Sequence, residues 1–232
     1  MQTIADRLAH AQKMIAQTID EAHRPANSVK LLAVSKTKPV SDLRQAYDSG
    51  QRLFGENYVQ EGVEKIEEMQ ELSDIEWHFI GPLQSNKTRL VAAHFDWVQS
   101  VDRLKIAQRL SSQRLANKTP LQLLIQVNID DEQSKSGVTL QEVEALAKGI
   151  SALPNVTLRG LMAIPRANPT AEQQVQAFTQ LKASFERLKQ QYSSIDTLSI
   201  GMSNDMSAAI HAGSTMVRIG TAIFGARAPK QQ

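Results

Sequence analysis

The sequence contains no cysteine, few aromatic residues and no long apolar run. Without cysteine the chain has no disulfide, no thiolate metal ligand and no cysteine nucleophile, which is compatible with a reducing compartment. No apolar stretch approaches the roughly 20 residues that a membrane-spanning helix needs, and the first residues form no apolar core of a signal peptide. We therefore expect a cytoplasmic protein without a membrane partner.

Nucleic-acid binding, metal chemistry and serine-hydrolase chemistry are also disfavoured. The pI is near 8.8, but 26 basic and 24 acidic residues are mixed along the chain, only 5% of residues are aromatic, and no basic block occurs. The five histidines show no metal-ligand spacing. Serine is plentiful, yet no Gly-x-Ser-x-Gly motif is found. We expect no nucleic-acid partner and no metal.

The order of apolar runs indicates a parallel sheet. After an amphipathic segment from about Thr3 to Ala22, short apolar or β-branched runs alternate with helical patterns. The eight expected strands are Lys30–Ser35, Gln51–Gly55, Ile75–Ile80, Asp96–Val101, Leu121–Ile129, Thr157–Ala163, Thr197–Met202 and Met216–Gly220. No linker divides the chain, so we expect residues 1–232 to form one domain.

Eight strands are the number that closes a (β/α)8 TIM barrel, an α/β fold whose main rival here is an open doubly wound sheet. The open sheet usually carries a glycine-rich nucleotide turn after its first strand. Here Lys36-Thr37-Lys38-Pro39 follows that strand, without glycine, and no Walker motif occurs. We therefore predict the barrel, in which chemistry collects at the carboxyl ends of the strands and phosphate is often held after strands seven and eight.

The charged stretch Glu61 to Glu71 and the glycine at position 50 belong to helical patterns. The stretch also holds apolar residues at helical spacing, so we interpret it as the solvated face of a helix and not as an acidic site. Gly50 follows the preceding helical pattern, as a glycine just beyond a helix C-terminus would.

Lys36 is the first candidate functional residue. It follows the apolar run Leu31–Ser35, so its amine would reach the barrel mouth from a crowded apolar wall. Desolvation there lowers the pKa of a lysine and raises its neutral, nucleophilic fraction, as Schiff-base formation requires. The alternative is a surface lysine at a strand end. Lys38 competes for the role, but it precedes Pro39, which favours an extended loop, so we treat Lys38 as exposed.

Two glycine-and-hydroxyl turns follow the last two predicted strands. Gly201-Met202-Ser203 is typical of a strand end turning into a helix, which Ser203 would cap and whose free amides could bind an anion. Gly220-Thr221 repeats the arrangement after strand eight. Capping and close packing explain either turn alone, whereas two on neighbouring strands favour a phosphate site. An amine facing both turns suggests an aldehyde that carries a phosphate, and the candidate is pyridoxal phosphate.

Three more residues lie near the predicted strand ends. Arg218 shares a face with Gly220, so it should point into the barrel, where it would contact a cofactor or pair with a carboxylate such as Glu56. Asn57 and His78 lie near the ends of strands two and three. Either could orient a ligand, and His78 could equally be a hydrogen-bonded core residue.

Seven segments in register carry a family resemblance. They are Ala33-Val34-Ser35-Lys36, Phe54-Gly55-Glu56-Asn57-Tyr58, Trp77-His78-Phe79-Ile80-Gly81-Pro82-Leu83-Gln84, Ser134-Lys135-Ser136-Gly137, Gly160-Leu161-Met162, Gly201-Met202-Ser203 and Arg218-Ile219-Gly220. With them the chain resembles the YggS-type pyridoxal-phosphate homeostasis proteins, also called proline synthetase co-transcribed homologues, from about Val29 to Arg227.

The resemblance implies a single barrel like the N-terminal domain of alanine racemase, with pyridoxal phosphate bound as an internal aldimine to Lys36. It implies phosphate contacts from the turns at Ser203 and Gly220-Thr221, and places Arg218 at the pyridine nitrogen. The expected cofactor-binding residues are Lys36, Asn57, His78, Met202, Ser203, Arg218, Gly220 and Thr221. Family members are regarded as proteins that keep the reactive aldehyde in balance, without established turnover, so no catalytic residue is expected.

Three interpretations of function stay open: a pyridoxal-phosphate carrier or regulator, a pyridoxal-phosphate-dependent amino-acid racemase, and a barrel enzyme that forms a lysine imine without a cofactor. A racemase of the related fold adds a C-terminal β domain, whereas this chain ends within a dozen residues of Gly220, and its tyrosines fall in helical patterns. A cation at the pyridine nitrogen would also weaken the ring as an electron sink. We expect a monomeric carrier whose candidate partners are apo-enzymes that use the cofactor.

Overall fold

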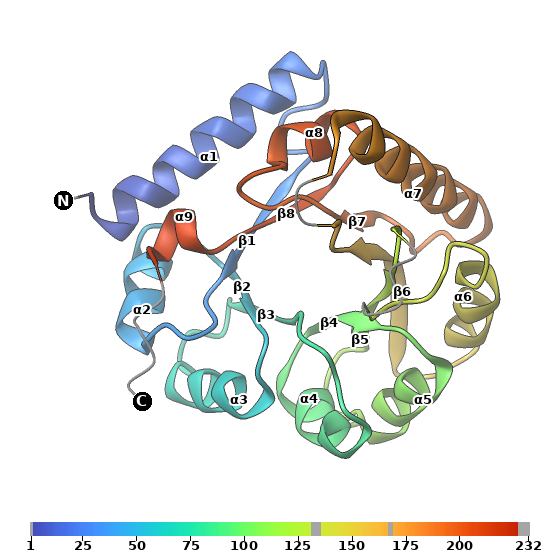
Figure 1. The fold of residues 1–232 in the computed structure, drawn as a ribbon. Coiled ribbons are helices and arrows are strands. Elements are labelled where there is room, and N and C mark those ends of the chain that lie inside the picture. Colours follow the sequence, from blue (N-terminus) through green and yellow to red (C-terminus); the bar gives the residue numbers. More distant parts are fainter. Residues whose placement is uncertain (1, 131–135, 167–168, 227–232) are drawn as a thin grey trace, which may run out of the picture.

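Eight parallel strands pair in the order of the sequence and close into a barrel, with helices around its outside (Figure 1). The structure is a computed structural model that describes residues 2–130, 136–166 and 169–226. The strands are β1 (Lys30–Val34), β2 (Leu53–Glu56), β3 (Glu76–Phe79), β4 (Trp97–Val101), β5 (Leu121–Val127), β6 (Val156–Ala163), β7 (Thr197–Ser199) and β8 (Met216–Ile219). This confirms the predicted TIM barrel.

The helices follow the strands as the alternation predicted. They are α1 (Ile4–Glu21), α2 (Val40–Asp48), α3 (Val59–Glu68), α4 (Thr88–His94), α5 (Leu104–Gln113), α6 (Val143–Ser151), α7 (Ala171–Gln191), α8 (Met206–His211) and α9 (Thr221–Phe224), with a short 3₁₀ helix, η1 (Ser85–Lys87), before α4. Gly50 lies just beyond α2 at φ +97° and its amide bonds the Tyr47 carbonyl, so the predicted terminating glycine is confirmed.

Strand β7 is the strand whose predicted end differs most from the structure. The prediction extended it to Met202, but it stops at Ser199. Gly201 takes φ +101°, which leaves extended backbone, and the Met202 amide bonds the Asp205 side chain instead of a neighbouring strand. The chain therefore turns toward the barrel mouth earlier than its apolar pattern indicated.

Two layers of side chains fill the space on either side of the strands. Most buried apolar residues pack in one cluster that includes both strand and helix residues. A separate small cluster of Trp97, Leu124 and Met162 comes from strands alone. Three buried polar residues of the strands, Gln99, Ser199 and Arg218, contact one another by hydrogen bonds, so part of the strand-lined core is polar.

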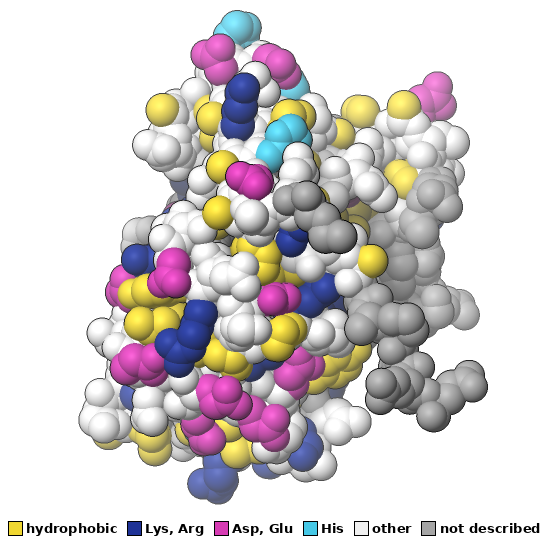
Figure 2. Space-filling model, turned by 90° about the vertical axis from the view of Figure 1, so that its left-hand side faces the viewer, with side chains coloured by type: hydrophobic (Ala, Val, Ile, Leu, Met, Phe, Trp, Pro, Cys, Tyr) yellow, Lys and Arg dark blue, Asp and Glu magenta, His cyan; other side chains and the backbone are white. Residues whose placement is uncertain are grey.

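Helix α1 covers the barrel beside the last elements of the chain. Thr3 and Asp6 form a capping box at its start, and it contacts α2, α8 and α9. On this side of the molecule, basic and acidic side chains are interspersed among apolar ones (Figure 2). Within the described residues, no helix is both long and apolar enough to cross a bilayer.

Gly160 is required where β6 passes β7. Its φ is +148°, and a Cβ there would lie 1.9 Å from the Thr197 carbonyl oxygen, which is backbone and cannot rotate away. The pairing of β6 with β5 also shifts register next to it, between Leu123 and Leu124. Only glycine satisfies both the dihedral angle and the close approach.

We expect Gly160→Ala to destabilise the barrel by more than about 3 kcal/mol, because β6 and β7 must separate to admit the methyl group. Gly50→Ala is the matched control: its φ is +97° but no atom lies within 4 Å of a Cβ, so it should lose only about 1 kcal/mol from backbone strain. Urea unfolding followed by circular dichroism gives both values. Equal losses in the two variants would show that the clash with Thr197 is not the cause.

Candidate functional site

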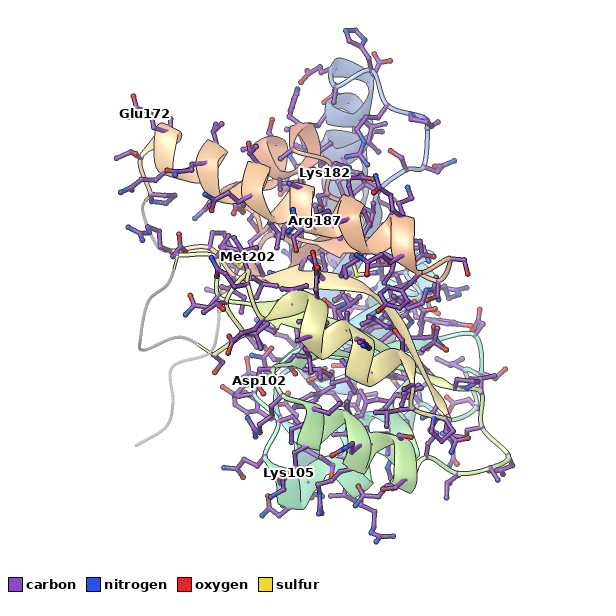
Figure 3. The ribbon with its side chains drawn as sticks, turned by 90° about the vertical axis from the view of Figure 1, so that its right-hand side faces the viewer. Asp102, Lys105, Glu172, Lys182, Arg187 and Met202 are labelled. Atoms are coloured by element: carbon purple, nitrogen blue, oxygen red, sulfur yellow. The ribbon has the colours of Figure 1, made fainter. Side chains whose placement is uncertain are left out.

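The predicted site residues gather where the strands end. Lys36 lies two residues beyond β1, Asn57 follows β2 directly, and the turns at Ser203 and Thr221 follow β7 and β8. Because all strands are parallel, these positions share the carboxyl-terminal mouth of the barrel. In Figure 3 Met202 and Asp102, which follow β7 and β4, lie on the same side of the molecule.

A buried ion pair fixes the backbone that carries Lys36. The Ser35 hydroxyl donates to Glu56 Oε1 at 2.6 Å, and Lys65 Nζ donates to the Ser35 carbonyl at 2.8 Å and to Glu56 Oε1 at 2.9 Å. Lys65 also pairs with Glu61 at 2.6 Å. Since both polar groups of Ser35 are held, the residue that precedes Lys36 has little freedom to move. The Lys36 side chain is half-buried.

Lys65 was missed because it lies in the charged stretch interpreted as a solvated helix face. Residues 61–68 of that stretch lie in helix α3 and the last three lie beyond it, and Lys65 points inward and is buried. Burial raises the pKa of Glu56, while Lys65 and Ser35 act in the opposite direction. Glu56 pairs with Lys65 and not with Arg218, so the predicted alternative of an Arg218–Glu56 ion pair is wrong.

The competitor Lys38 is half-buried, and its Nζ donates to the Ala226 carbonyl at 2.7 Å. The prediction of an exposed lysine is therefore only partly right. Thr37, between the two lysines, has φ +64°, and its amide donates to Glu61 Oε1 at 2.5 Å. This turn sends Lys38 toward the end of α9, away from the path of β1.

The turn after β7 differs from the prediction in one respect. Ser203 does not cap the following helix: α8 begins at Met206, with Asp205 before it. Asp205 Oδ1 instead accepts the Met202 amide at 2.6 Å, which closes the turn and leaves Met202 and Ser203 exposed. A Cβ on Gly201 would lie 2.7 Å from Ala209 Cβ, so this turn packs tightly on α8.

The turn after β8 leads directly into helix α9. The Gly220 carbonyl accepts the amides of Ile223 and Phe224, both at 2.9 Å, so α9 begins at Thr221 with its first amides directed away from the helix. A Cβ on Gly220 would lie 3.1 Å from the Val34 carbonyl oxygen. The turn is therefore packed against the end of β1, next to the segment that leads to Lys36.

Arg218 is a buried cation without a carboxylate partner among the described residues. Its Nη1 donates to the Ser199 carbonyl at 2.8 Å and to Ser199 Oγ at 2.9 Å, and its Nη2 donates to the Ala163 carbonyl at 2.9 Å. A guanidinium has five N–H donors, and these bonds use three of them. Burial lowers the pKa of Arg218 to about 10, so it stays charged at neutral pH.

Asn57 and His78 lie at different depths. Asn57 Oδ1 is buried with no hydrogen-bond partner in the described chain. His78 is fully buried: its Nε2 lies 3.0 Å from Glu76 Oε1, its Nδ1 lies 2.9 Å from Gln99 Nε2, and its ring stacks on Trp97. Burial lowers the pKa of His78. Both ring nitrogens are thus engaged by protein side chains.

Two cavities lie away from these residues, at the opposite mouth of the barrel. One, of about 810 Å³, lies between α1 and the starts of β1 and β2, and the other, of about 390 Å³, lies at the starts of β3, β4 and β5. The candidate site is therefore defined by strand ends and by buried polar groups. In the described part of the chain, no cluster of three or more His, Asp or Glu side chains could hold a metal ion.

The pattern had placed all three tyrosines in helices, but only one of them lies within a helix. Tyr47 lies in α2, but Tyr58 and Tyr192 flank α3 and α7. Tyr58 directly follows Asn57 and is 52% exposed, so it is a phenol close to the strand ends. Of the segment Ser134-Lys135-Ser136-Gly137, residues 134 and 135 lie outside the described residues.

Comparisons with known proteins agree on the type of barrel. The pattern of the family "Alanine racemase, N-terminal domain" matches residues 6–228. The "Pyridoxal phosphate homeostasis protein" of Pasteurella multocida is 60% identical over 228 residues, which cover 97% of this chain and 98% of that protein. The structure of PipY from Synechococcus elongatus PCC7942, solved with PLP bound, superposes with a TM-score of 0.78 at 37% identity, covering 91% of this chain and all of PipY.

More distant structures share the fold alone. Alanine racemase from Corynebacterium glutamicum superposes with a TM-score of 0.68 at 15% identity, covering 98% of this chain and 62% of the racemase. The match extends over the whole ring of strands and helices described above. It supports the architecture, and an identity this low says nothing about chemistry.

We expect Lys65→Met to destabilise the protein by about 3 to 5 kcal/mol at neutral pH, because Glu56 is left as a buried carboxylate without its cation. When the pKa of a carboxyl is higher in the folded protein than in the unfolded chain, the protein loses stability as pH rises above the unfolded-state pKa, which is about 4.3 for glutamate. The loss caused by Lys65→Met should therefore shrink as pH falls toward 4.3.

Lys182→Met is the matched control for this prediction, since Lys182 belongs to an exposed i,i+4 pair with Glu186 on α7 (Figure 3). It should cost less than about 1 kcal/mol at any pH. Urea unfolding at several pH values measures both variants. A loss for Lys65→Met that does not change with pH would contradict the assignment of the penalty to the Glu56 charge.

Proposed function

Because the chain belongs to the family of pyridoxal phosphate homeostasis proteins, we propose that it binds pyridoxal phosphate at the carboxyl-terminal mouth of its barrel and acts in the homeostasis of that cofactor. The observation that carries the proposal is Arg218, a buried cation at this mouth with N–H donors to spare and no carboxylate partner within the described residues. Such a cation calls for an acceptor, which the cofactor provides.

The residues at the mouth fit this cofactor by their own chemistry. Asn57 supplies a buried carbonyl oxygen without a partner in the described chain, and Arg218 supplies unused donors. Gly201 and Gly220 let the two turns pack closely on Ala209 and Val34, where a side chain would collide. Pyridoxal phosphate supplies an electrophilic aldehyde for Lys36, and its pyridine nitrogen and anionic phosphate are acceptors for the unused donors of Arg218 and for the amides of the turns.

Each predicted residue has a role in this proposal. Lys36 holds the cofactor covalently, and its position is kept by the Ser35–Glu56–Lys65 contacts. The backbone amides and hydroxyls of Ser203 and Thr221 hold the phosphate, because free amides at turns and helix starts bind anions. Arg218 faces the pyridine nitrogen. Asn57 and Met202 border the ligand from the ends of β2 and β7.

His78 takes part indirectly. Its ring nitrogens are both engaged by Glu76 and Gln99, and its side chain is fully buried. It therefore contributes to the site through the residues that it contacts, and not through a bond of its own to the cofactor.

The electrostatics favour a carrier over an amino-acid racemase. Arg218 remains positively charged at neutral pH, and a cation at the pyridine nitrogen disfavours protonation of that nitrogen. An unprotonated ring is a weaker electron sink, so removal of an α-proton from a bound amino acid would be slow. Racemisation is kept as the second candidate because Tyr58 lies beside Asn57 and could serve as an opposing base.

The remaining expectations form part of the same proposal. The protein acts in the cytoplasm as a monomer, its residues 1–232 work as a single cofactor-binding domain, and its partners are apo-enzymes that depend on pyridoxal phosphate. A lysine imine enzyme without a cofactor is the third interpretation, and an absorbance spectrum of the purified protein distinguishes it.

Reduction with borohydride after addition of one equivalent of pyridoxal phosphate should place the pyridoxyl label on Lys36. We expect Lys36 to react because this half-buried lysine lies two residues beyond the end of β1. Peptide mapping identifies the labelled lysine, and Lys36→Ala should lose the label while Lys38→Ala keeps it. Predominant labelling of Lys38 or Lys135 in the parent protein would refute the assignment.

Incubation with alanine in deuterated water should give no exchange of the α-hydrogen at an enzymatic rate, because the ring is held as a weak electron sink. Mass spectrometry of the amino acid detects proton removal even when no product accumulates. Exchange at roughly 1 per second or faster would defeat the carrier interpretation. In that case Tyr58→Phe would test whether Tyr58 is the base.

A further inference from the structure

A chain of side-chain hydrogen bonds crosses the interior of the barrel beneath Arg218. Arg218 donates to Ser199 Oγ at 2.9 Å, Ser199 Oγ donates to Gln99 Oε1 at 2.7 Å, and Gln99 Nε2 lies 2.9 Å from His78 Nδ1. His78 Nε2 then lies 3.0 Å from Glu76 Oε1. The five residues, which we call the interior chain, come from β8, β7, β4 and β3.

The two ends of the interior chain determine the direction of every bond. A guanidinium can only donate, so Ser199 must accept from Arg218 and use its own proton toward Gln99. Gln99 then presents its carbonyl to Ser199 and its NH₂ to His78, in agreement with the second contact of Gln99 Nε2 to Met216 Sδ at 3.2 Å. His78 accepts at Nδ1, and it therefore carries its proton on Nε2 and donates it to the Glu76 carboxylate.

Burial and charge favour this single arrangement. Gln99, Ser199 and His78 are essentially inaccessible to solvent, so a reversed or missing bond would leave a buried polar atom unsatisfied. The pKa of His78 is lowered, chiefly by burial, so that it stays neutral. Burial acts to raise the pKa of Glu76, but the hydrogen bond from His78 and the charge of Lys30 act in the opposite direction, and the pKa is lowered overall, so Glu76 stays ionised.

The far end of the interior chain lies at the amino-terminal mouth of the barrel. Glu76 lines the cavity of about 390 Å³ together with charged residues from other strands and loops, including Lys30, Asp96 and Arg159. Glu76 is half-buried there, while Arg218 is 5% exposed at the opposite mouth. The chain thus joins a cation at one mouth to a carboxylate at the other, and aligned hydrogen bonds of this kind strengthen one another.

We propose that Ser199, Gln99 and His78 are positioning residues that hold the Arg218 guanidinium in its orientation toward the cofactor, through a one-directional hydrogen-bond chain anchored on Glu76. The proposal rests on the proposed function for the identity of the ligand. The arrangement of the chain itself does not depend on any ligand. Of the three Arg218 bonds, only the one to Ser199 Oγ belongs to the chain, because the other two go to backbone carbonyls.

The chain can be tested in the protein without cofactor. Nitrogen-15 NMR of histidine-labelled protein at pH 7 should show His78 in its neutral form, with the proton on Nε2 and not on Nδ1. Gln99→Glu replaces the donor that faces Nδ1 with a carboxylate oxygen, so His78 should then carry a proton on Nδ1. Protonation of Nδ1 in the parent protein, or no change in Gln99→Glu, would overturn the proposed direction.

The positioning role is tested by the affinity for pyridoxal phosphate. Ser199→Ala and Gln99→Met should each weaken binding by about tenfold. In Ser199→Ala, Arg218 loses its side-chain acceptor, and in Gln99→Met, Ser199 loses the acceptor that orients its hydroxyl. Gln99→Glu keeps an oxygen for Ser199 and should bind more tightly than Gln99→Met. Ser100→Ala is the matched control, because Ser100 is the next residue on β4 and its buried hydroxyl has no partner in the described chain.

The outcomes separate the two proposals. Binding by Ser199→Ala and Gln99→Met as tight as by Ser100→Ala would overturn the positioning role. A parent protein that does not bind pyridoxal phosphate would overturn the proposed function and the positioning role together, while the His78 tautomer would still decide the direction of the chain. If Ser199→Ala does not fold, the comparison of Gln99→Glu with Gln99→Met decides the positioning role alone.

Discussion

The closure of β8 onto β1 is the constraint on which the rest of the structure depends. The two strands pair in parallel from Lys30 with Met216 to Ala33 with Ile219, and the Lys30 amide bonds the Thr215 carbonyl at 2.8 Å. This pairing brings Gly220 against Val34 and so places the last turn of the barrel beside the segment that carries Lys36. Residues separated by some 180 positions become neighbours only because the ring closes.

The barrel holds charge in its interior in two different ways. Glu56 is neutralised directly by Lys65, whereas Arg218 is held by two carbonyls and a hydroxyl. A paired charge fixes the backbone on which it lies, since neither partner can leave without exposing the other to an apolar surrounding. A cation solvated by carbonyls keeps its charge available to a ligand. The two arrangements suit a covalent anchor and a noncovalent contact, respectively.

Sequence alone predicted the parts of this protein that depend on local patterns. The alternation of apolar runs and helical spacing located all eight strands, and it placed Lys36 and Arg218 toward the carboxyl-terminal ends of their strands. The ends of strands were less predictable, because β7 stops where Gly201 turns and where Asp205 takes the Met202 amide. That bond depends on the turn geometry, which the apolar pattern does not encode.

The residues that sequence did not reveal are those whose partners are distant in the chain. Lys65 looked like one charge among many on α3, and only its contact with Glu56 and Ser35 distinguishes it. Gln99 lies in the otherwise mostly apolar strand β4, and its partner Ser199 is 100 residues away. An amide within an apolar strand is the one signal that could have drawn attention to it. The family resemblance named candidate cofactor-binding residues but not the residues that support them.

The position of β8 along the chain has a consequence for synthesis. Among the described strands β8 is the last to leave the ribosome, and it carries Arg218 and leads directly into Gly220 and Thr221. A nascent chain therefore exposes Lys36 long before the opposite wall of the proposed site exists. Parallel closure between the first and last strands is a distant contact and forms slowly. If the site is the one proposed above, a growing chain offers its lysine before the enclosing wall has formed, so the complete site requires the whole barrel.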